Sequence, residues 1–587
     1  MASREPIAEL AERWLQQDHD ESTRKEIEEL VTTHNSIELE KRLRKRIAFG
    51  TAGLRSQMKA GFAHMNFLTV LQASQGLATY IRDQQSNSLA VDEHLSIVIG
   101  YDARYKSEKF ARLAAAAFLA KGFQVLWFGE LVHTPMVPFA VSRYKAAAGV
   151  MVTASHNPKA DNGYKVYWSN GCQIIPPHDT GIANAIEQVE AILTWNDKAV
   201  DSSPFVRRIF PEATQAYCAA LRRLAPPPPE SRRATFMYTP MHGVGLPFMR
   251  EVAMMLGFEN DSMRVVEAQA QPDPEFPTVP FPNPEEKGAL NLAFQEAERN
   301  ASHIVIASDP DADRFAAAEK LEDGRWHQFT GNQMGVLLAS YIFETYKDDK
   351  NKLTMLASTV SSRMLAAMAK KEGFHSRETL TGFKWLGNVA QDLQTGGCDA
   401  AFAYEEAIGY MFPTVVWDKD GIAAAAVFLT AWQRWQQQGL TLWQKLQELY
   451  KTYGYFEDAN TYLITPSPDV TEQVFGAIRR SGSNGGVPDA VGRRSILRWR
   501  DLTVGYDTAI VDGKPDLPID ASAQMITCEL EDVVFTARGS GTEPKIKLYI
   551  EGTAASSADA KQRATEVLQD LLAAWFKPEY GLKLAGC

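Results

Sequence analysis

The sequence predicts an α/β protein of several domains, and three observations carry this prediction. The chain has 587 residues, far more than one hydrophobic core organises, so roughly three to five domains are expected. From Leu95 onward, short apolar runs alternate with helix-like stretches, as in α/β layers. The alternation starts again at Thr235 and at Gly331, which indicates three such cycles before the texture changes near the C-terminus.

The composition is that of a globular protein in a reducing compartment. Hydrophobic residues make up 45% and charged residues 23% of the chain. A net charge of -11 argues against general nucleic-acid binding, although a local basic site stays open. No signal pattern opens the chain and no apolar run reaches membrane-spanning length, so we expect a cytoplasmic protein without membrane association. The cysteines have no metal-ligand spacing and are expected to be free thiols: Cys172, Cys218, Cys398, Cys528 and Cys587.

The chain is expected to begin with helices and then a glycine-rich loop. Apolar residues such as Leu10 and Trp14 fall at helix-face spacing within residues 6–48. The basic run 41–46 is interpreted as a solvated helix end in preference to a binding patch. In Phe49–Arg55, glycines would let backbone amides approach a phosphate, and the arginine offers a two-pronged donor. Taken alone, the same segment equally suits a turn.

The first α/β cycle supplies the first candidate site. Its expected elements are strands at Ile97–Ile99, Gln124–Phe128 and Ala146–Val152, a helix at Ser107–Lys121, and a helix capped by Asp179–Thr180 that runs to about Leu193. The last strand stops at Thr153-Ala154-Ser155-His156-Asn157-Pro158, where the proline prevents its continuation. We therefore expect one exposed hydroxyl, that of Ser155, on a tight loop at a strand end, where α/β sheets place their chemistry. By itself the heptapeptide Val152–Pro158 is more often an ordinary turn.

The second cycle supplies a candidate metal site. After a stiff loop expected at Pro226–Pro229, the strand Thr235–Tyr238 leads to the turn Met241–Gly245. The proline-rich stretch Asp273–Pro284 is either an ordered irregular loop or a mobile one. The strand His303–Ala307 then delivers three carboxylates at alternate positions on a non-helical loop: Asp309, Asp311 and Asp313.

These carboxylates can converge on one hard cation. A calcium helix-loop-helix site is excluded, because Arg314 stands where that loop needs glycine and Lys320 where it needs glutamate. Mg²⁺ held by carboxylates and a phosphate oxygen fits better, and an acidic surface turn is the alternative.

The third cycle, from Gly331 to about Tyr455, and the C-terminal part add two more polar segments. Ala401–Tyr410 contains Glu405-Glu406-Ala407. Arg538-Gly539-Ser540-Gly541-Thr542 combines a guanidinium, two hydroxyls and two glycines, which suits a phosphate clamp without a metal, although such residues are common in turns. A closing amphipathic helix is expected at Ala558–Phe576. An acceptor hydroxyl with a metal serves a phosphatase, whereas an enzyme that moves phosphate within one sugar also needs the clamp.

Together these motifs resemble the α-D-phosphohexomutase superfamily along essentially the whole chain, most closely the phosphoglucomutase branch that also acts as phosphopentomutase. The resemblance implies three related α/β domains and a smaller α+β C-terminal domain around a central cleft. The expected limits are 1–210 for the phosphoserine-loop domain with its N-terminal helices, 211–328 for the metal-loop domain, 329–456 for the sugar-loop domain and 457–587 for the phosphate-binding domain.

The resemblance also implies roles for individual residues. Ser155 would carry a phosphate and, with Asp309, Asp311 and Asp313, bind Mg²⁺. Lys165 and Lys419 would act as general base and acid, which requires lowered lysine pKa values. His156, Arg314 and Arg55 would balance negative charge nearby. The remaining contacts fall into two sets: Thr381, Lys384 and Glu405 for the sugar, and Arg538, Ser540, Gly541 and Thr542 for the distal phosphate.

The expected reaction converts ribose or deoxyribose 1-phosphate to the 5-phosphate, and glucose 1-phosphate to the 6-phosphate, through a bisphosphate intermediate. Glucose 1,6-bisphosphate is the expected activator, sugar phosphates are the expected partners, and a monomer is expected. Hexose-specific members have serine where this chain has Ala407, which favours pentose tolerance. The alternatives are a glucose 1,6-bisphosphate synthase that uses an acyl-phosphate donor, a phosphatase, and a non-catalytic phosphosugar sensor, against which Ser155 and the intact aspartates argue.

Overall fold

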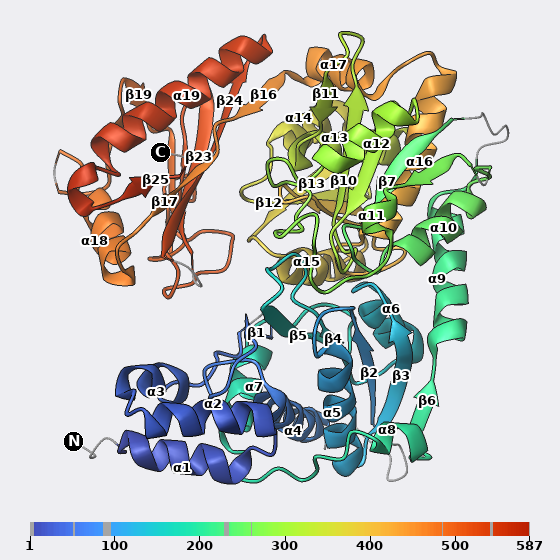
Figure 1. The fold of residues 1–587 in the computed structure, drawn as a ribbon. Coiled ribbons are helices and arrows are strands. Elements are labelled where there is room, and N and C mark those ends of the chain that lie inside the picture. The colour runs from blue at the N-terminus through green and yellow to red at the C-terminus, as the bar shows by residue number, and fades with distance from the viewer. Residues whose placement is uncertain are drawn as a thin grey trace. The chain divides into compact units, whose positions relative to one another are not determined.

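The computed structural model describes residues 5–50, 53–85, 95–227, 234–259, 261–483, 485–540 and 544–585. The chain forms two compact units. The first contains Met1–Thr345 and Gly382–Thr441, and the second contains Tyr346–Thr381 and Leu442–Cys587. Each unit is described by itself below, with the elements labelled as in Figure 1.

The first unit opens with three helices, α1 (Ile7–Gln17), α2 (Glu21–Thr32) and α3 (Ser36–Leu43). They pack around Trp14, which is fully buried and meets Phe62 edge to face at 5.0 Å between ring centres. Helix is confirmed in this region, as three separate segments that end at Leu43.

The first sheet has the strand order β1-β5-β4-β2-β3-β6. Four strands are parallel: β4 (Ala148–Val152), β2 (Ser96–Tyr101), β3 (Gln124–Leu131) and β6 (Val206–Arg208). Two antiparallel strands close one side, β5 (Asp161–Trp168) and β1 (Leu54–Gln57). The associated helices are α4 (Phe67–Gln85), α5 (Ser107–Ala120), α6 (Met136–Tyr144), α7 (His178–Glu187), α8 (Ala199–Ser202) and α9 (Phe210–Leu224). The carboxyl ends of the parallel strands therefore share one edge, and Ser155 follows β4 there.

The expected limits of α7 are wrong at both ends. The helix begins at His178, so Asp179 lies in its first turn instead of capping it. It ends at Glu187 and not near Leu193, because Gln75 of α4 binds the backbone beyond it: its side chain accepts from Leu193 N at 2.8 Å and donates to Ala191 O at 2.9 Å. A tertiary contact thus overrides the local helical pattern.

The second sheet of the first unit has the order β11-β10-β9-β7-β8. Its strands are β7 (Phe236–Thr239), β8 (Met263–Val265), β9 (Ile304–Ser308), β10 (Phe315–Lys320) and β11 (Trp326–Gln328), with β7, β8 and β9 parallel. The helices α10 (Leu246–Met255), α11 (Glu267–Ala270) and α12 (Asn291–Arg299) belong to this cycle. The proline-rich stretch 273–284 is an irregular segment held by backbone bonds such as Asp273 N to His242 O at 3.0 Å. The predicted Pro226–Pro229 loop lies partly outside the described residues.

The third cycle contributes elements to both units. The first unit holds α13 (Gly331–Thr345), α15 (Phe383–Thr395), the antiparallel pair β14 (Asp399–Glu405) and β15 (Gly409–Met411), and α16 (Gly421–Gln437). The second unit holds the parallel pair β12 (Leu353–Ser358) and β13 (His375–Thr379), with α14 (Met364–Glu372) and α17 (Leu442–Tyr453).

The rest of the second unit is an antiparallel sheet, unlike the parallel-rich sheets before it. Its order is β21-β20-β22-β23-β24-β17-β25, with β16 also paired to β24. The strands are β16 (Tyr455–Asp458), β17 (Thr461–Ile464), β20 (Arg498–Asp501), β21 (Tyr506–Asp507), β22 (Met525–Glu529), β23 (Val533–Gly539), β24 (Lys545–Ala554) and β25 (Lys583–Leu584). Also present are α18 (Pro468–Ile478), the hairpin of β18 (Ala490–Val491) and β19 (Arg494–Ser495), and the short helix η1 (Pro578–Tyr580).

The closing helix α19 (Ser557–Ala574) lies along β24 (Figure 1) and covers a core that includes Trp499, Phe535 and Trp575. The predicted α+β C-terminal domain is thereby confirmed.

Two further expectations concern cysteines and membranes. Cys172, Cys218, Cys398 and Cys528 are free thiols, and Cys587 lies outside the described residues. Within the described ranges, no helix has both the length and the apolar character that crossing a bilayer needs.

Candidate active site

Asp309, Asp311 and Asp313 lie together on the turn between β9 and β10. All three are fully buried, and each offers a carboxylate oxygen within 4.8 Å of the others. Two glycines allow other elements to reach this turn. A Cβ at Gly243 would lie 2.3 Å from the Pro310 backbone, and a Cβ at Gly421 would lie 2.3 Å from Arg314 O. The turn is therefore held on two sides by backbone that tolerates no side chain.

The electrostatics of this cluster fit a hard cation. Asp311 Oδ1 and Asp313 Oδ1 are buried and find no hydrogen-bond partner among the described residues. Burial, and then the charges of Asp311 and Asp313, raise the pKa of Asp309 well above its usual range. Buried carboxylate oxygens without donors are what Mg²⁺ or a similar ion would satisfy. The residues present thus fit the predicted metal site.

Two lysines balance part of the negative charge. Lys165, on β5, lies 2.8 Å from Asp311 Oδ2 and 2.9 Å from Asp313 Oδ2. Lys419 Nζ lies 2.6 Å from Asp313 Oδ2. Burial by itself would raise the pKa of Asp311, but Lys165 and Lys419 hold it well below its usual range.

The expected lowering of the Lys165 pKa is contradicted. Burial alone would lower this pKa, but the adjacent carboxylates of Asp311 and Asp313 outweigh it and raise the pKa above its ordinary value. Lys165 is therefore an ammonium ion at neutral pH, with its nitrogen committed to the two aspartates.

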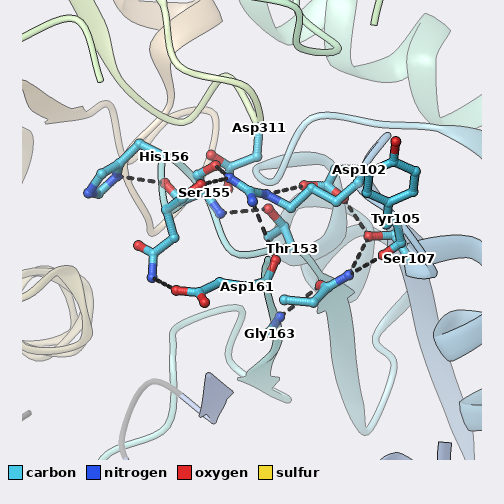
Figure 2. A network of polar contacts seen from close by, with 12 residues as sticks. Asp102, Tyr105, Ser107, Thr153, Ser155, His156, Asp161, Gly163 and Asp311 are labelled. Atoms are coloured by element: carbon cyan, nitrogen blue, oxygen red, sulfur yellow. Dashed lines mark hydrogen bonds and ion pairs between the residues drawn. The ribbon is translucent and has the colours of Figure 1, made fainter. Parts of the chain in front are cut away.

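Ser155 stands directly after β4 and reaches the cluster. Its hydroxyl donates to Asp309 Oδ2 at 2.8 Å and lies 3.2 Å from His156 Nδ1. Its backbone takes a left-handed conformation, φ 54°, and its N–H donates to Thr153 Oγ1 at 2.9 Å (Figure 2). Ser155 is 3% exposed, so the expected exposed hydroxyl is in fact buried beside the aspartates.

The other predicted charge-balancing residues surround this point. Burial, followed by the positive charges of Arg314 and Arg55, lowers the pKa of His156 well below its ordinary value, which keeps the imidazole neutral. Arg314 donates its backbone N–H to Asp309 Oδ1 at 3.1 Å, and its guanidinium faces Glu285 at 3.9 Å. Arg55 lies on β1, where it pairs with Gly163 of β5.

Two of the predicted sugar-binding residues, Lys384 and Glu405, belong to the first unit. Glu405 ends β14 and accepts from Gly382 N at 2.6 Å, and Lys384 Nζ lies 5.4 Å from the centre of the Trp385 ring. Ala407 is half-buried in the turn between β14 and β15. A Cβ at Gly331 would meet Glu406 O at 1.8 Å, so this turn rests directly on the start of α13.

The second unit brings Thr381 and Arg538 together. Arg538 Nη1 donates to Thr381 Oγ1 at 2.6 Å. Ser540 directly follows β23, and its N–H donates to Lys545 O at 2.8 Å. Gly541 and Thr542 lie outside the described residues.

Sequence reasoning missed two residues that support the site. Thr134, after β3, donates its hydroxyl to Asp311 Oδ2 at 2.6 Å. Arg104, after β2, donates to the carbonyls of the Ser155 loop. Both residues follow parallel strands, β3 and β2, in the same sheet as β4. The rule that chemistry lies at the carboxyl ends of parallel strands directed attention to Ser155, and it could also have found these two residues.

Comparison with known proteins agrees with this arrangement. Models of the α/β/α domains I, II and III of phosphoglucomutase/phosphomannomutase match residues 46–192, 215–322 and 330–453. A protein of Schizosaccharomyces pombe described as a probable phosphoribomutase is 45% identical over 98% of this chain and 98% of its own length. The chain belongs to the α-D-phosphohexomutase superfamily.

Two further members of the superfamily mark its range. The glucose 1,6-bisphosphate synthase of Homo sapiens is 40% identical to this chain, over 95% of this chain and 92% of that protein. The crystal structure of pp63/parafusin, a phosphoglucomutase from Paramecium in its open form, is similar with a TM-score of 0.64 at 17% identity. The superposition covers 91% of this chain and 95% of the parafusin chain. The chain therefore has the phosphohexomutase fold. As a member of this superfamily, with a probable phosphoribomutase among its relatives, it is an isomerase.

Proposed function

We propose that the chain moves a phosphoryl group between the 1-position and the 5- or 6-position of one sugar phosphate, with pentose phosphates as good substrates. The observation that carries this proposal is the buried Ser155 hydroxyl, 2.8 Å from Asp309 Oδ2 in a carboxylate cluster suited to Mg²⁺. The likeness to a phosphoribomutase supports the pentose assignment.

In the proposed mechanism, Ser155 carries the phosphoryl group between the two positions. The bond from phosphorus to the Ser155 oxygen breaks as the oxygen of a free sugar hydroxyl bonds to phosphorus. A proton replaces the phosphoryl group on the Ser155 oxygen and balances the one that the sugar hydroxyl loses, so the products are a sugar bisphosphate and a free Ser155 hydroxyl. The other phosphate then returns to Ser155. Asp309, Asp311 and Asp313 would hold Mg²⁺, which supplies charge neutralisation for the transferred group.

Lys165 enters this mechanism as an ammonium ion. Its raised pKa suits a fixed positive charge that stabilises the phosphoryl group, and suits neither the general base it was expected to be nor a general acid, whose pKa would lie near the working pH. Phosphoryl transfer through a loose transition state depends more on positioning and charge stabilisation than on proton removal. Neutral His156 then lies beside the reacting oxygen without adding another cation.

We further propose that Lys384 and Glu405 bind the sugar with Thr381, and that Arg538, Ser540, Gly541 and Thr542 bind the phosphate that does not react. Glucose 1,6-bisphosphate is the proposed activator, because an enzyme that loses the Ser155 phosphate to water needs a bisphosphate to restore it. The domain limits given above and the monomeric state are part of the same proposal.

Ala407 is the proposed determinant of pentose tolerance. A site built to hydrogen-bond a sugar hydroxyl rejects analogues that lack it, and an alanine methyl group makes no such demand. We expect wild-type enzyme to convert ribose 1-phosphate at least as efficiently as glucose 1-phosphate.

The test is to measure kcat/KM for both substrates on wild type and on Ala407→Ser. The serine should shift the ratio toward glucose 1-phosphate by about 0.5–1.5 kcal/mol, one neutral hydrogen bond. Ala268→Ser, at an exposed position on α11, is the matched control and should leave the ratio unchanged. Wild-type enzyme that ignores ribose 1-phosphate would refute the pentose assignment.

A glucose 1,6-bisphosphate synthase is the second candidate, favoured by the 40% identity to a protein with that activity. Such an enzyme would phosphorylate glucose 1-phosphate from an acyl phosphate. Incubation with 1,3-bisphosphoglycerate and glucose 1-phosphate separates the two: stoichiometric bisphosphate accumulation supports the synthase, and isomerisation without accumulation supports the mutase.

A further inference from the structure

The backbone of the Ser155 loop is held by one buried side chain, Arg104. This residue is 5% exposed. Its Nη2 donates to Ser155 O and, at 2.6 Å, to Asn157 O, and its Nη1 donates to Pro158 O at 3.1 Å. Figure 2 shows labelled residues of the surrounding polar network, among them Asp102, Ser155 and Asp161. Three carbonyls of one loop thus converge on a single planar guanidinium.

Arg104 is itself fixed from two sides. Asp102, at the end of β2, accepts from Arg104 N at 3.1 Å, and its other carboxylate oxygen lies 3.5 Å from Arg104 Nε. The ring of Phe276 covers the guanidinium, with 5.1 Å from Arg104 Cζ to the ring centre. Phe276 is 2% exposed and adopts φ 49°, a backbone conformation that a bulky residue rarely takes.

Phe276 belongs to the proline-rich segment 273–279, which comes from the second sheet's domain and lies over the first. Its neighbour Glu275 accepts from Tyr105 OH and, at 2.6 Å, from Lys159 Nζ. Tyr105 is the next residue after Arg104, and Lys159 is the next residue after Pro158 of the Ser155 loop. The segment 273–279 therefore contacts the chain beside Arg104 and the chain beside the loop that Arg104 holds. The end of the segment is held at Thr278, whose Oγ1 lies 2.8 Å from His242 Nε2.

We propose that Arg104 is a positioning residue for phosphoryl transfer, and that the segment 273–279 acts as a brace that holds it. The proposal rests on the proposed role of Ser155 as phosphoryl carrier. A non-glycine residue in the left-handed region is strained and persists where its surroundings enforce it. At Ser155, Arg104 supplies that enforcement through the carbonyl, which leaves the hydroxyl free to face Asp309.

The proposal predicts a loss of turnover without a loss of sugar binding. Arg104→Lys keeps the charge, but one ammonium nitrogen cannot reach three carbonyls in the directions that the guanidinium serves. A misplacement near 1 Å can cost about a hundredfold in rate. We therefore expect kcat per phosphorylated Ser155 to fall about ten- to hundred-fold, with KM for the sugar phosphate within about twofold of wild type.

The experiment measures Ser155 phosphate occupancy by peptide mass analysis, kcat, KM and thermal stability on the full chain. Arg112→Lys, on α5 of the same domain and paired with Asp201, is the matched control and should behave as wild type. A folded Arg104→Lys protein with kcat per phosphorylated site within twofold of wild type would overturn the proposal. Wild-type enzyme without phosphate on Ser155 would instead overturn the proposed function.

A second variant tests the brace if Arg104→Lys does not fold. Phe276→Leu keeps an apolar cover over Arg104 and removes the aromatic face. We expect kcat per phosphorylated site to fall about three- to tenfold, in line with a cation–π contact worth about 1 kcal/mol, again with unchanged KM. Reduced thermal stability with unchanged kcat per phosphorylated site would mean that the segment has a purely structural role, which would refute the brace.

Discussion

Charge balance among individual side chains decides the chemistry of the metal turn. Three buried carboxylates face two lysine ammonium groups, and Asp311 is paired through one oxygen while the other finds no donor among the described residues. An amide at this position would keep the shape but remove the charge that a cation needs. Residue-scale predictions therefore concern metal affinity first.

Asp311→Asn should weaken Mg²⁺ activation at least about tenfold. Removal even of partners that only orient metal ligands costs about 10–100-fold in affinity, and Asp311 is itself a proposed ligand. Titration of activity and of bound metal against Mg²⁺ measures the effect. The exposed Asp323→Asn, on the hairpin beyond β10, is the control. Unchanged metal dependence in Asp311→Asn would mean that the cation is held elsewhere.

The sequence alone could single out candidate residues that form a local pattern. The alternate aspartates and the serine at a strand end are visible as patterns, and the structure brings Ser155 within hydrogen-bond distance of Asp309. The pKa of Lys165 was not predictable, because its carboxylate partner Asp311 lies 146 positions away. The position of Arg104 after a parallel strand was visible in the sequence, but its contacts were not, because they are backbone carbonyl oxygens, which leave no mark on residue type.

At the scale of elements, close backbone approach fixes how the metal turn is supported. The start of α16 meets the turn through Gly421, whose N–H donates to Ala312 O at 3.2 Å. Any Cβ there would lie 2.3 Å from Arg314 O and 2.8 Å from Ala312 O, so the helix and the turn would have to separate.

Gly421→Ala should therefore lower Mg²⁺ affinity about tenfold or more, although residue 421 touches no metal ligand side chain. Isothermal titration with Mg²⁺ and the metal dependence of kcat both measure this. Gly486→Ala is the matched control, because a Cβ there meets nothing within 4 Å. A normal Mg²⁺ titration in Gly421→Ala would show that the turn accommodates the methyl group.

In the second unit, β13 is joined to β20 by a half-buried ion pair. Arg500 Nη2 donates to Glu378 Oε1 at 2.6 Å, and Arg363 Nη1 lies 3.5 Å from Glu378 Oε2. Burial by itself would raise the pKa of Glu378, but Arg363 and Arg500 lower it to about 2. Because the pKa of Glu378 is lower in the folded protein, the carboxylate stabilises the fold at every pH above its ordinary pKa of 4.5. This stabilisation is lost as the pH falls from 4.5 toward 2.

Glu378→Gln should reduce the free energy of unfolding by about 1–3 kcal/mol at pH 7, after allowance for partial exposure. The difference from wild type should be constant from pH 7 to about 4.5 and shrink at lower pH. Chemical unfolding followed by tryptophan fluorescence at several pH values measures it, with exposed Glu322→Gln as control. A difference that grows as the pH falls would contradict the pairing.

For the whole molecule, the predicted three α/β domains and a smaller α+β C-terminal domain are confirmed. Each α/β cycle repeats the same pattern of apolar runs, so an error in one element does not change the fold class. The end of α7 was wrong because Gln75 binds the chain beyond it. The proposed function, by contrast, rests on motifs from both compact units.

A change at Arg538, in the second unit, tests the proposed binding of the phosphate that does not react. Loss of a charge-assisted bond to phosphate costs about 1.5–3 kcal/mol, so Arg538→Ala should lower kcat/KM about ten- to hundred-fold. The Mg²⁺ titration should be unchanged, because the proposed metal ligands lie in the first unit. Thr381→Val removes only the hydroxyl partner of Arg538 and should have a smaller effect. Altered metal affinity with normal sugar kinetics would contradict the assignment.

The central claim is that Ser155 carries the phosphoryl group during turnover. Peptide mass analysis of enzyme quenched during turnover of ribose 1-phosphate, with glucose 1,6-bisphosphate present, tests it directly. The account predicts one phosphate, located on Ser155, and no measurable turnover by Ser155→Ala. A phosphate on another residue, or a Ser155→Ala protein with near wild-type rate, would contradict it.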